Sequence, residues 1–362
     1  MANILVLGAG MMGSAFTVPL LDRRHDVRLV GTHLDREIIA QLRDDGVHPK
    51  LGVDLPRELR PFQIEELGEA AEGADAIVLG VSSAGIAWAI EKIAPIVRAG
   101  QLLFMITKGL AFRSGRVLTL PELVREGLPH ELRDSVHPAA IAGPCIAGEL
   151  ARRVPSVVVV AGNHAESLQR IEQLCRTDYY HLRPTTDVLG AELSAALKNA
   201  YAMGIAFATG MHEARGGTAG SVAMHNLESA VFAQSIVEMR KLVEVLGGRR
   251  STVSGLAGVG DLDVTTNGGR TGRFGKLLGT GLRRDEAVQR MQGATLECLE
   301  ILAVMREVVA ELDAHGQLRT PELPLLGHMI EVALDGAEVA LPLDRFFRDG
   351  EPPSEADRGT WS

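Results

Sequence analysis

The first fifteen residues constrain the fold of this chain more than any other segment. An apolar run at 3–7 enters the glycine-rich turn G-A-G-M-M-G at 8–13, and the residues that follow favour a helix. In such a unit Gly8 permits the tight turn, Gly10 lets the backbone approach a ligand, and Gly13 lets the helix pack on the strand. Free N–H groups at the helix N-terminus favour phosphate groups. This context predicts a dinucleotide-binding turn, and a glycine-rich turn without ligand is the alternative.

The first half of the chain alternates apolar runs with helical patterns. Near-continuous apolar runs are typical of parallel strands covered on both faces. We expect strands at 3–7, 27–30, 76–81, 102–107, 139–142, 157–161 and 179–182, with helices at 13–22, 35–44 and 86–97. This alternation predicts an α/β fold, a doubly wound, mostly parallel Rossmann sheet over residues 1–187.

The pattern becomes helical near residue 187. We expect helices at 189–210, 226–246, 273–278, 284–292, 295–315 and 324–334, and therefore an all-helical domain over 188–344. The segment 211–224 holds several glycines and is expected to form a loop. The segment 345–362 combines acids, prolines and glycine with few apolar residues, so we expect a flexible tail.

Composition narrows the classes of function. The net charge of −9 argues against a nucleic-acid partner, although a few basic side chains can still attract a small anionic substrate into a cleft. Three widely spaced cysteines form neither a disulfide framework nor a zinc pattern, so we expect no metal and a reducing, cytoplasmic location. No apolar run reaches the ~18 residues that span a bilayer, and the first strand starts too early for a signal peptide.

The end of the second predicted strand bears on the choice of cofactor. An NAD site usually has an acid there that binds a ribose hydroxyl. The first acid here, Asp35, is expected instead to cap the next helix. Thr32, His33 and Arg36 are then free to contact a 2′-phosphate, so NADP is favoured over NAD. The alternative is that these three are ordinary solvated loop residues.

Two segments after predicted strands carry candidate site residues. Lys108 follows the strand at 102–107 and is expected to face the cleft at the carboxyl end of the sheet, although a lysine there can also be solvated. The turn at 142–149 offers N–H groups that can cradle an anion or a cofactor edge. Its Cys145 is not expected to be a nucleophile, because no histidine lies near it in sequence.

Two segments of the second half add polar residues. Lys198 lies on an otherwise apolar helix among small neighbours, so it is either a desolvated acid/base or a lysine that reaches solvent. The glycine-rich segment 255–275 holds Asp261, Thr265 one helical turn later, and Arg270. The forked guanidinium of Arg270 suits a phosphate group, and a plain loop is the alternative.

Together these segments resemble the NAD(P)-dependent glycerol-3-phosphate dehydrogenase family, in a branch closer to the archaeal enzymes than to the common bacterial ones. The resemblance extends from Gly8 to about Gln292 and is carried by T-K-G at 107–109, G-P at 143–144, A-L-K-N at 196–199, G-L-A-G-V-G-D-L at 255–262 and R-F-G at 273–275. It implies reversible hydride transfer between NAD(P)H and dihydroxyacetone phosphate, which gives sn-glycerol 3-phosphate.

The resemblance also implies roles for individual residues. Lys198 matches the proton donor and acceptor, Lys108 the lysine that polarises the substrate oxygen, and Asp261 the acid that orients the catalytic lysine. Arg270 matches the arginine that meets the substrate phosphate. The expected substrate contacts are Lys108, Gly143, Cys145, Lys198, Asp261, Thr265, Arg270 and Thr271. The expected cofactor contacts are Gly8, Gly10, Met11, Met12, Gly13, Thr32, His33, Arg36, Ser82, Lys108, Ala147, Arg270 and Gln292.

Departures from the family pattern surround this set of residues. Thr271 replaces an asparagine, Gln292 replaces a glutamate, and Cys145 stands where serine or threonine is common. These changes leave open another small phosphorylated ketone, a polyol or a hydroxy acid as substrate, and a dinucleotide sensor without turnover as a different function.

The apolar helices of the second half bear on the oligomeric state. Apolar helix positions such as Leu302, Val309 and Leu312 favour burial by a second subunit, and the resemblance also suggests a homodimer. The active site is expected between the two domains, with a hinge near 184–189.

Overall fold

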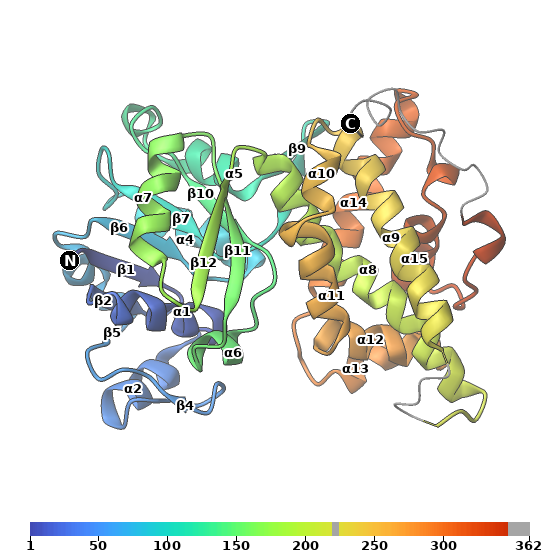
Figure 1. Ribbon diagram of the computed structural model, residues 1–362, viewed down its shortest axis with the longest axis horizontal. Coiled ribbons are helices and arrows are strands. Elements are labelled where there is room, and N and C mark those ends of the chain that lie inside the picture. The colour runs from blue at the N-terminus through green and yellow to red at the C-terminus, as the bar shows by residue number, and fades with distance from the viewer. Residues whose placement is uncertain (219–223, 347–362) are drawn as a thin grey trace.

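Strands and helices alternate around one eight-stranded sheet in the N-terminal half. The computed structural model describes residues 1–218 and 224–346 (Figure 1). The strands are β1 (Asn3–Leu7), β2 (Asp26–Val30), β5 (Arg60–Phe62), β6 (Ala76–Leu79), β7 (Leu102–Met105), β10 (Ala139–Ala142), β11 (Ser156–Ala161) and β12 (Tyr180–Thr185). Their spatial order is β12-β11-β10-β7-β6-β1-β2-β5. All neighbouring strands are parallel except β10 and β11, which confirms the mostly parallel doubly wound sheet.

Helices cover both faces of this sheet. They are α1 (Met11–Asp22), α2 (Arg36–Asp44), α3 (Leu67–Ala71), α4 (Ile86–Ile93), α5 (Leu120–Gly127), α6 (Ala147–Ala151) and α7 (Ala165–Cys175). Successive residues of a strand point to opposite faces. Val6 of β1 accordingly packs in one apolar cluster with Phe16 of α1, whereas Leu7 packs in another with Ile86 of α4. This double burial explains why the strands read as continuous apolar runs.

The C-terminal half is built around α8 (Val188–Ala214), which contacts α9, α11, α12 and α14. The other elements are α9 (His225–Val245), α10 (Arg250–Val253), a π-helix (Leu256–Gly260), α11 (Asp261–Thr266), α12 (Arg270–Gly279), α13 (Arg284–Arg290), α14 (Glu297–Ala314) and α15 (Pro324–Asp335). Among the described residues beyond 187 every regular element is helical, as expected. Because β12 ends at Thr185 and α8 begins at Val188, we propose that 1–187 and 188–344 are the two domains.

Several expected boundaries are wrong. Helix α8 continues to Ala214, so 211–214 are not a loop, and α12 begins at Arg270 rather than at 273. Part of the expected loop, 219–223, and most of the expected tail, 347–362, lie outside the described residues.

The apolar residues that favoured a second subunit are buried within the chain itself. Leu302 is fully buried, and Val309 and Leu312 are at most 6% exposed, in the core of the helical half. Helix α14 packs against α8 and α15, and these neighbours cover its apolar face. The apolar-surface argument for a dimer is therefore wrong.

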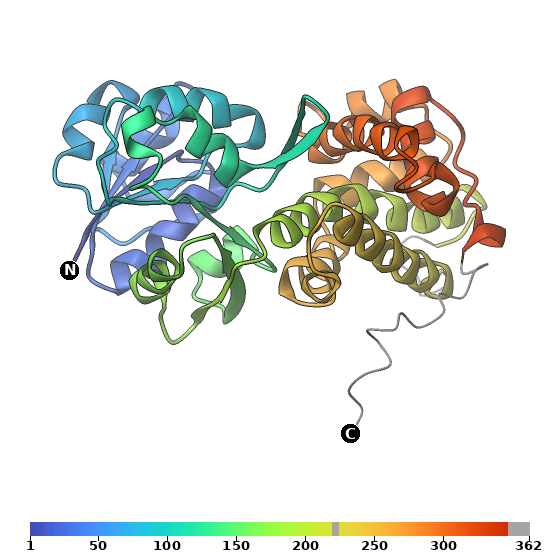
Figure 2. The same ribbon diagram turned by 90° about the horizontal axis from the view of Figure 1, so that it is seen from above.

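Two short hairpins were not predicted from the sequence. The first, β3 (Val47–His48) with β4 (Val53–Asp54), follows α2. The second, β8 (Leu110–Arg113) with β9 (Arg116–Thr119), leaves the sheet half and reaches the helical half (Figure 2). Phe112 and Val117 of this second hairpin pack against the helical core, so the two halves meet there as well as at α8.

Candidate active site

Two lysines and one aspartate meet between the two halves. Asp261 accepts a hydrogen bond from Lys108 Nζ on Oδ2 at 2.6 Å, and it accepts another from Lys198 Nζ on Oδ1. Lys108 Nζ also donates to the carbonyl oxygen of Gly143 at 3.0 Å. Four of the predicted site residues are thus joined in one network, although they lie up to 153 residues apart in sequence.

Local structure explains how each side chain reaches this network. Lys108 and Gly143 follow β7 and β10, adjacent parallel strands whose carboxyl ends share one edge of the sheet. Lys198 lies on α8, and Asp261 begins α11 directly after the π-helix. Gly258 lies within that π-helix, where a Cβ atom would come 2.0 Å from the Val253 carbonyl oxygen. Only glycine fits there, so the glycine-rich segment sets the position of Asp261.

The two lysines have opposite electrostatic environments. Burial, together with the positive charge of Lys108, lowers the pKa of Lys198 to about 8. Burial also opposes the charge on Lys108, but the charge of Asp261 and its hydrogen bond raise the pKa of Lys108 above its ordinary value. Lys198 can therefore exchange a proton near neutral pH, whereas Lys108 stays a fixed cation.

Cys145 lies near this network but is not ionised. Burial raises the pKa of its thiol to about 11, although the charge of Lys108 lowers it in part. A thiol with this pKa is protonated at neutral pH, which agrees with the expectation that Cys145 is not a nucleophile.

The remaining predicted substrate residues follow Asp261. The hydroxyl of Thr265 donates to the Asp261 carbonyl oxygen at 2.6 Å, so it lies one turn along α11. Thr271 is buried in the first turn of α12. Arg270 is half exposed and forms an ion pair with Glu297 of α14. The roles of these three residues in substrate binding stay predictions.

A small cleft between the halves adjoins the network. Its lining residues are Ser83, Lys108, Gly109, Leu110, Ala196, Asn199, Glu297, Glu300, Ile301 and Val304. Ser83 Oγ, from the sheet half, donates to Glu300 of α14 at 2.8 Å across this cleft. Glu297 and Glu300 were not identified from the sequence, because an acid in the first turn of a helix is ordinarily explained by the helix dipole.

The glycine-rich turn has the geometry expected of a dinucleotide site. Gly8 has φ +113°, and a Cβ atom at Gly13 would come 2.1 Å from the Gly8 carbonyl oxygen. A Cβ atom at Gly10 would meet nothing within 4 Å, so the backbone is open to a ligand at this point. No side chain caps the N-terminus of α1, where Met11 and Met12 lie. These features fit a pyrophosphate group.

Further predicted cofactor residues lie along the same sheet edge or in the helical half. Ser82 and Ala147 follow β6 and β10, and β6 is the neighbour of β1. Gln292 lies in the helical half, after α13. Their contacts with the cofactor stay predictions.

Asp35 does not cap α2 as expected. Its Oδ2 atom accepts hydrogen bonds from Thr32 N at 2.9 Å and from Thr32 Oγ1 at 2.8 Å, and no side-chain cap forms. The carboxylate therefore turns back toward the end of β2. His33 contacts the ring of Trp88 edge-on, and Arg36 forms an exposed ion pair with Glu65.

Glu192 is a buried acidic residue outside the set of predicted site residues. It is fully buried on α8, and neither carboxyl oxygen makes a hydrogen bond of normal geometry. Burial raises the pKa of Glu192 to about 8, and the charge of Lys108 lowers it in part. A glutamate six residues before Lys198 in an apolar helix was the available signal.

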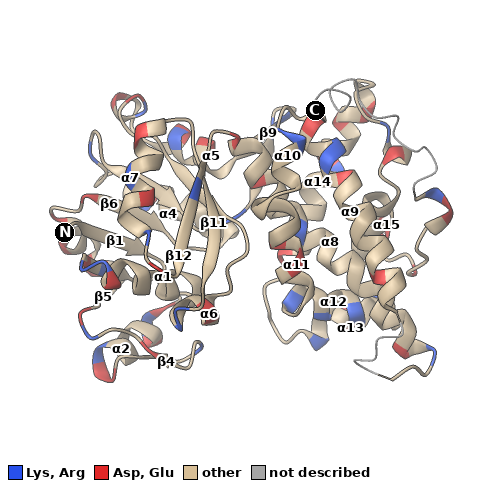
Figure 3. Cartoon of the chain, in the orientation of Figure 1, with Lys and Arg blue, Asp and Glu red and all other residues tan. Residues whose placement is uncertain are grey.

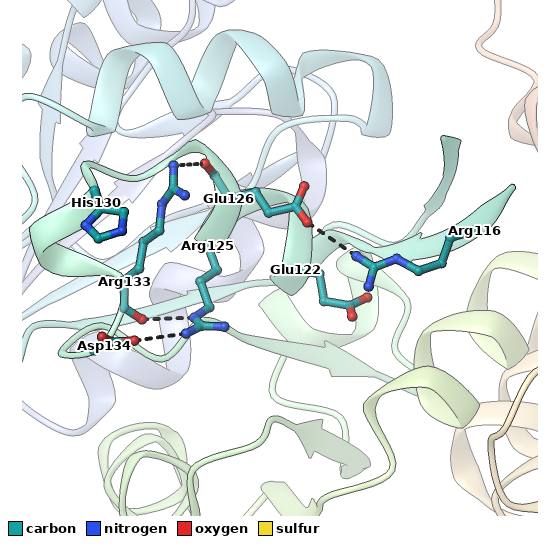
Figure 4. A pocket seen from close by; sticks show the side chains of 7 residues that line it. All are labelled: Arg116, Glu122, Arg125, Glu126, His130, Arg133 and Asp134. Atoms are coloured by element: carbon teal, nitrogen blue, oxygen red, sulfur yellow. Dashed lines mark hydrogen bonds and ion pairs between the residues drawn. The ribbon is translucent and has the colours of Figure 1, made fainter. Parts of the chain in front are cut away.

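A second pocket, on the surface of the sheet half, does not have the character of an active site. It encloses about 400 Å³ beside α5 and the segment that follows this helix, and no predicted site residue lines it (Figure 4). Its charged groups pair with one another: Arg116 with Glu126 and Arg125 with Asp134. Acidic and basic residues are interspersed over both halves in the view of Figure 3 as well.

Within 1–218 and 224–346, no helix is long and apolar enough to span a membrane. In the same ranges no three or more histidine, cysteine or acidic side chains come together as a metal site would require.

The chain was compared with known families and proteins. Residues 3–168 match the model of the NAD-dependent glycerol-3-phosphate dehydrogenase N-terminus, and 187–342 match that of its C-terminus. The NADP(+)-dependent glycerol-3-phosphate dehydrogenase of Archaeoglobus fulgidus is 40% identical over 80% of this chain and 83% of that protein. The glycerol-3-phosphate dehydrogenase [NAD(P)+] of Agrobacterium fabrum is 32% identical over 92% and 94%. The crystal structure of glycerol-3-phosphate dehydrogenase from Coxiella burnetii superposes with a TM-score of 0.76 at 26% identity, covering 93% and 96%.

Proposed function

The chain belongs to the family of NAD-dependent glycerol-3-phosphate dehydrogenases, and from this premise we propose that it interconverts dihydroxyacetone phosphate and sn-glycerol 3-phosphate. It is an NAD(P)-dependent oxidoreductase that acts on a CH–OH group. One observation carries the proposal most directly: Lys108 and Lys198 share the carboxylate of Asp261 between the two halves.

The proposed mechanism assigns each group a task. When bound, the reduced nicotinamide supplies the hydride that adds to the carbonyl carbon. Lys198 gives a proton to the oxygen as negative charge develops there, and it takes that proton back in the reverse direction. The ammonium of Lys108 stabilises the same oxygen electrostatically, and Asp261 holds both lysines in place.

The cofactor lies across the carboxyl edge of the sheet in this proposal. The N–H groups of Gly10, Met11, Met12 and Gly13 hold the pyrophosphate at the start of α1. We propose NADP as the preferred form, with Thr32, His33 and Arg36 near the 2′-phosphate. Arg36 must leave Glu65 to reach it, and the Asp35 carboxylate is engaged by Thr32 and by the Ala9 N–H group. The A. fulgidus relative named as NADP(+)-dependent supports this preference. The ratio of kcat/KM for NADPH to that for NADH measures it, and a higher value for NADH contradicts it.

Arg270 binds the substrate phosphate in this proposal, and it must leave Glu297 to do so. An exposed ion pair of this kind contributes up to about 1 kcal/mol. Glu297→Gln should therefore lower KM for dihydroxyacetone phosphate about two- to fivefold with little change in kcat. Glu307→Gln, which removes an exposed acid farther along α14, is the matched control and should change neither constant.

The decisive test is turnover by the purified chain. It should oxidise NADPH or NADH with dihydroxyacetone phosphate, and Lys198→Ala should reduce kcat at least ~10²-fold if Lys198 transfers the proton. A panel of longer ketose phosphates, glyceraldehyde 3-phosphate and non-phosphorylated keto acids serves as the comparison. If any member of the panel is turned over faster, that compound rather than dihydroxyacetone phosphate is the substrate.

We also propose that the protein is a cytoplasmic homodimer joined through its helical half. Its three cysteines are all free, which suits a reducing compartment. Because the exposed apolar side chains do not by themselves support the dimer, the proposal rests on the family. Light scattering that gives only the chain mass of 38.7 kDa would contradict it.

A further inference from the structure

Both backbone polar groups of Ala9, inside the glycine-rich turn, are bound by side chains of later segments. Asp35 Oδ2 accepts a hydrogen bond from Ala9 N at 3.2 Å. On the other side, His48 Nε2 lies 3.1 Å from the Ala9 carbonyl oxygen. Ser14 Oγ also donates to this oxygen at 3.1 Å, but Ser14 belongs to α1 and moves with the turn. His48 therefore holds the Ala9 carbonyl oxygen from outside the turn and its helix.

The contacts of His48 fix its tautomer. The ring is fully buried in the short hairpin that follows α2. Its Nδ1 atom accepts hydrogen bonds from Lys50 N at 3.2 Å and from Leu51 N at 3.1 Å. An atom that accepts two N–H groups cannot carry a proton, so the proton is on Nε2 and is donated to Ala9 O. The His48 ring thus stabilises its own hairpin through the bonds to Nδ1, and it binds the glycine-rich turn through Nε2.

We propose that His48 is a positioning residue for the dinucleotide. The Ala9 carbonyl and the Gly10 N–H group belong to one peptide plane, and the glycines at 8 and 10 leave the backbone here free to rotate; Gly8 already adopts φ +113°. Rotation of this plane would turn the Gly10 N–H group away from the pyrophosphate. By fixing the Ala9 carbonyl, His48 keeps this donor aimed at the cofactor before it binds. The inference rests on the proposed function, in which this turn binds NAD(P).

Two substitutions separate the two tasks of the ring. In His48→Asn the amide oxygen lies near the former Nδ1 position, so it can still accept from Lys50 N and Leu51 N, whereas the bond to Ala9 is lost. In His48→Gln the longer side chain brings an N–H group near the former Nε2 position, so the Ala9 bond is kept and the hairpin N–H groups are left unpaired.

His25 offers a matched control in the same half of the molecule. Its Nδ1 accepts from Ala2 N at 3.1 Å, and its Nε2 lies 3.0 Å from the Leu174 carbonyl oxygen. His25→Asn therefore removes the same kind of bond away from the glycine-rich turn.

The experiment measures NADPH binding to the purified full-length chain by fluorescence titration, together with kcat, KM and the thermal unfolding midpoint. His48→Asn should raise the Kd for NADPH about five- to tenfold, as expected for one lost hydrogen bond of about 1 kcal/mol or slightly more. At saturating NADPH its kcat should equal that of the wild type. His48→Gln should lower the midpoint more than His48→Asn but bind NADPH nearly normally. His25→Asn should leave the Kd unchanged.

An unchanged Kd in His48→Asn, or an equal rise in His25→Asn, overturns the inference. A parallel loss of binding and stability in both His48 variants also overturns it, because His48 would then be merely structural. The outcome for the proposed function is distinct. A wild-type chain that binds NADPH but does not reduce dihydroxyacetone phosphate refutes that function, while the Kd values still decide the role of His48.

Discussion

Lys198 and Lys108 contact the same carboxylate, yet only one of them is suited to proton transfer. Lys198 has its pKa lowered to about 8 by burial and by the charge of Lys108. In ketone reduction it must begin protonated, and in alcohol oxidation it must begin neutral. The pKa of Lys198 therefore sets opposite pH dependences for the two directions.

We predict that kcat for reduction falls as the pH rises through about 8, and that kcat for oxidation rises over the same range. Lys198→Arg keeps the positive charge but cannot release its proton, so it should nearly abolish oxidation at every pH. Initial rates in both directions from pH 6 to about pH 10 check this prediction. If the rate of Lys198→Arg still changes with pH near 8, the titrating group is not Lys198.

Glu192 should make the protein less stable as the pH rises. Burial raises the pKa of Glu192 to about 8, far above its ordinary value of 4.5. The folded state therefore holds a proton that the unfolded state releases. The contribution of this carboxyl group to stability is fully present below about pH 4.5 and is lost as the pH rises toward 8.

We predict that Glu192→Gln flattens this dependence, because an amide has no charge to bury. Between about pH 5 and 8, the free energy of unfolding of the wild type should fall relative to that of Glu192→Gln by about 1.4 kcal/mol per pH unit at most. Urea unfolding of both proteins at several pH values measures the difference. Parallel curves would show that Glu192 does not titrate in this range.

Lys108, Lys198 and Asp261 each stand out by their place in the sequence. Lys108 follows a buried strand, Lys198 lies on an apolar helix, and Asp261 follows a glycine-rich segment. His48 gave no such signal, because its role depends on a carbonyl group 39 residues away. The role of Glu297 likewise depends on its ion pair with Arg270, which lies 27 residues earlier in the sequence.

At the scale of elements, periodicity identified the long helices and the buried strands but not the short hairpins. Strands β3 and β8 have two and four residues, too few for a repeating pattern. The periodic pattern also does not define where a helix begins or ends. Helix α12 begins within a glycine-rich segment, at Arg270, where sequence propensity favours a turn.

The N-terminus of α15 is capped by a side chain of α9. Glu238 of α9 is fully buried and accepts hydrogen bonds from Leu325 N at 2.7 Å and Leu326 N at 2.8 Å, in the first turn of α15. It also accepts from Tyr201 Oη at 3.1 Å and Gln234 Nε2 at 2.8 Å. This carboxylate satisfies N–H groups that no residue of α15 itself can satisfy.

We predict that Glu238→Ala destabilises the protein by about 3 kcal/mol, because buried donors lose their acceptor. Glu238→Gln retains one accepting oxygen and should be less damaging. Urea unfolding gives both values, and Glu307→Ala on the exposed face of α14 is the control. Equal losses for alanine and glutamine at position 238 would contradict the capping role.

At the scale of the whole molecule, the hairpin of β8 and β9 couples the two halves. Phe112 and Val117 pack against the helical core, and Lys108 directly precedes the hairpin. The contact that joins the halves therefore also holds Lys108 near Asp261. The change from strands to helices near 187 could be predicted from the periodicity, whereas this coupling could not, because the hairpin belongs by sequence to the first half.

We predict that Phe112→Ala weakens this coupling. Loss of a partly buried aromatic side chain should cost about 1–2 kcal/mol, below the 3–5 kcal/mol typical of a full core position. Calorimetry should show one unfolding transition for the wild type and a broadened or split transition for Phe112→Ala. Arg113→Ala, on the exposed neighbouring position, should leave the transition unchanged. A uniform shift of one sharp transition in Phe112→Ala would mean that the hairpin does not couple the halves.

The two halves are joined at several separate places. Besides the start of α8, the hairpin packs against the helical core and the π-helix contacts β11. Lys108 adjoins one of these contacts and binds Asp261 across the boundary. A motion that separated the halves would have to break this buried ion pair together with the apolar packing beside it. The charged network thus ties the two halves together at the point where the chemistry is proposed to occur.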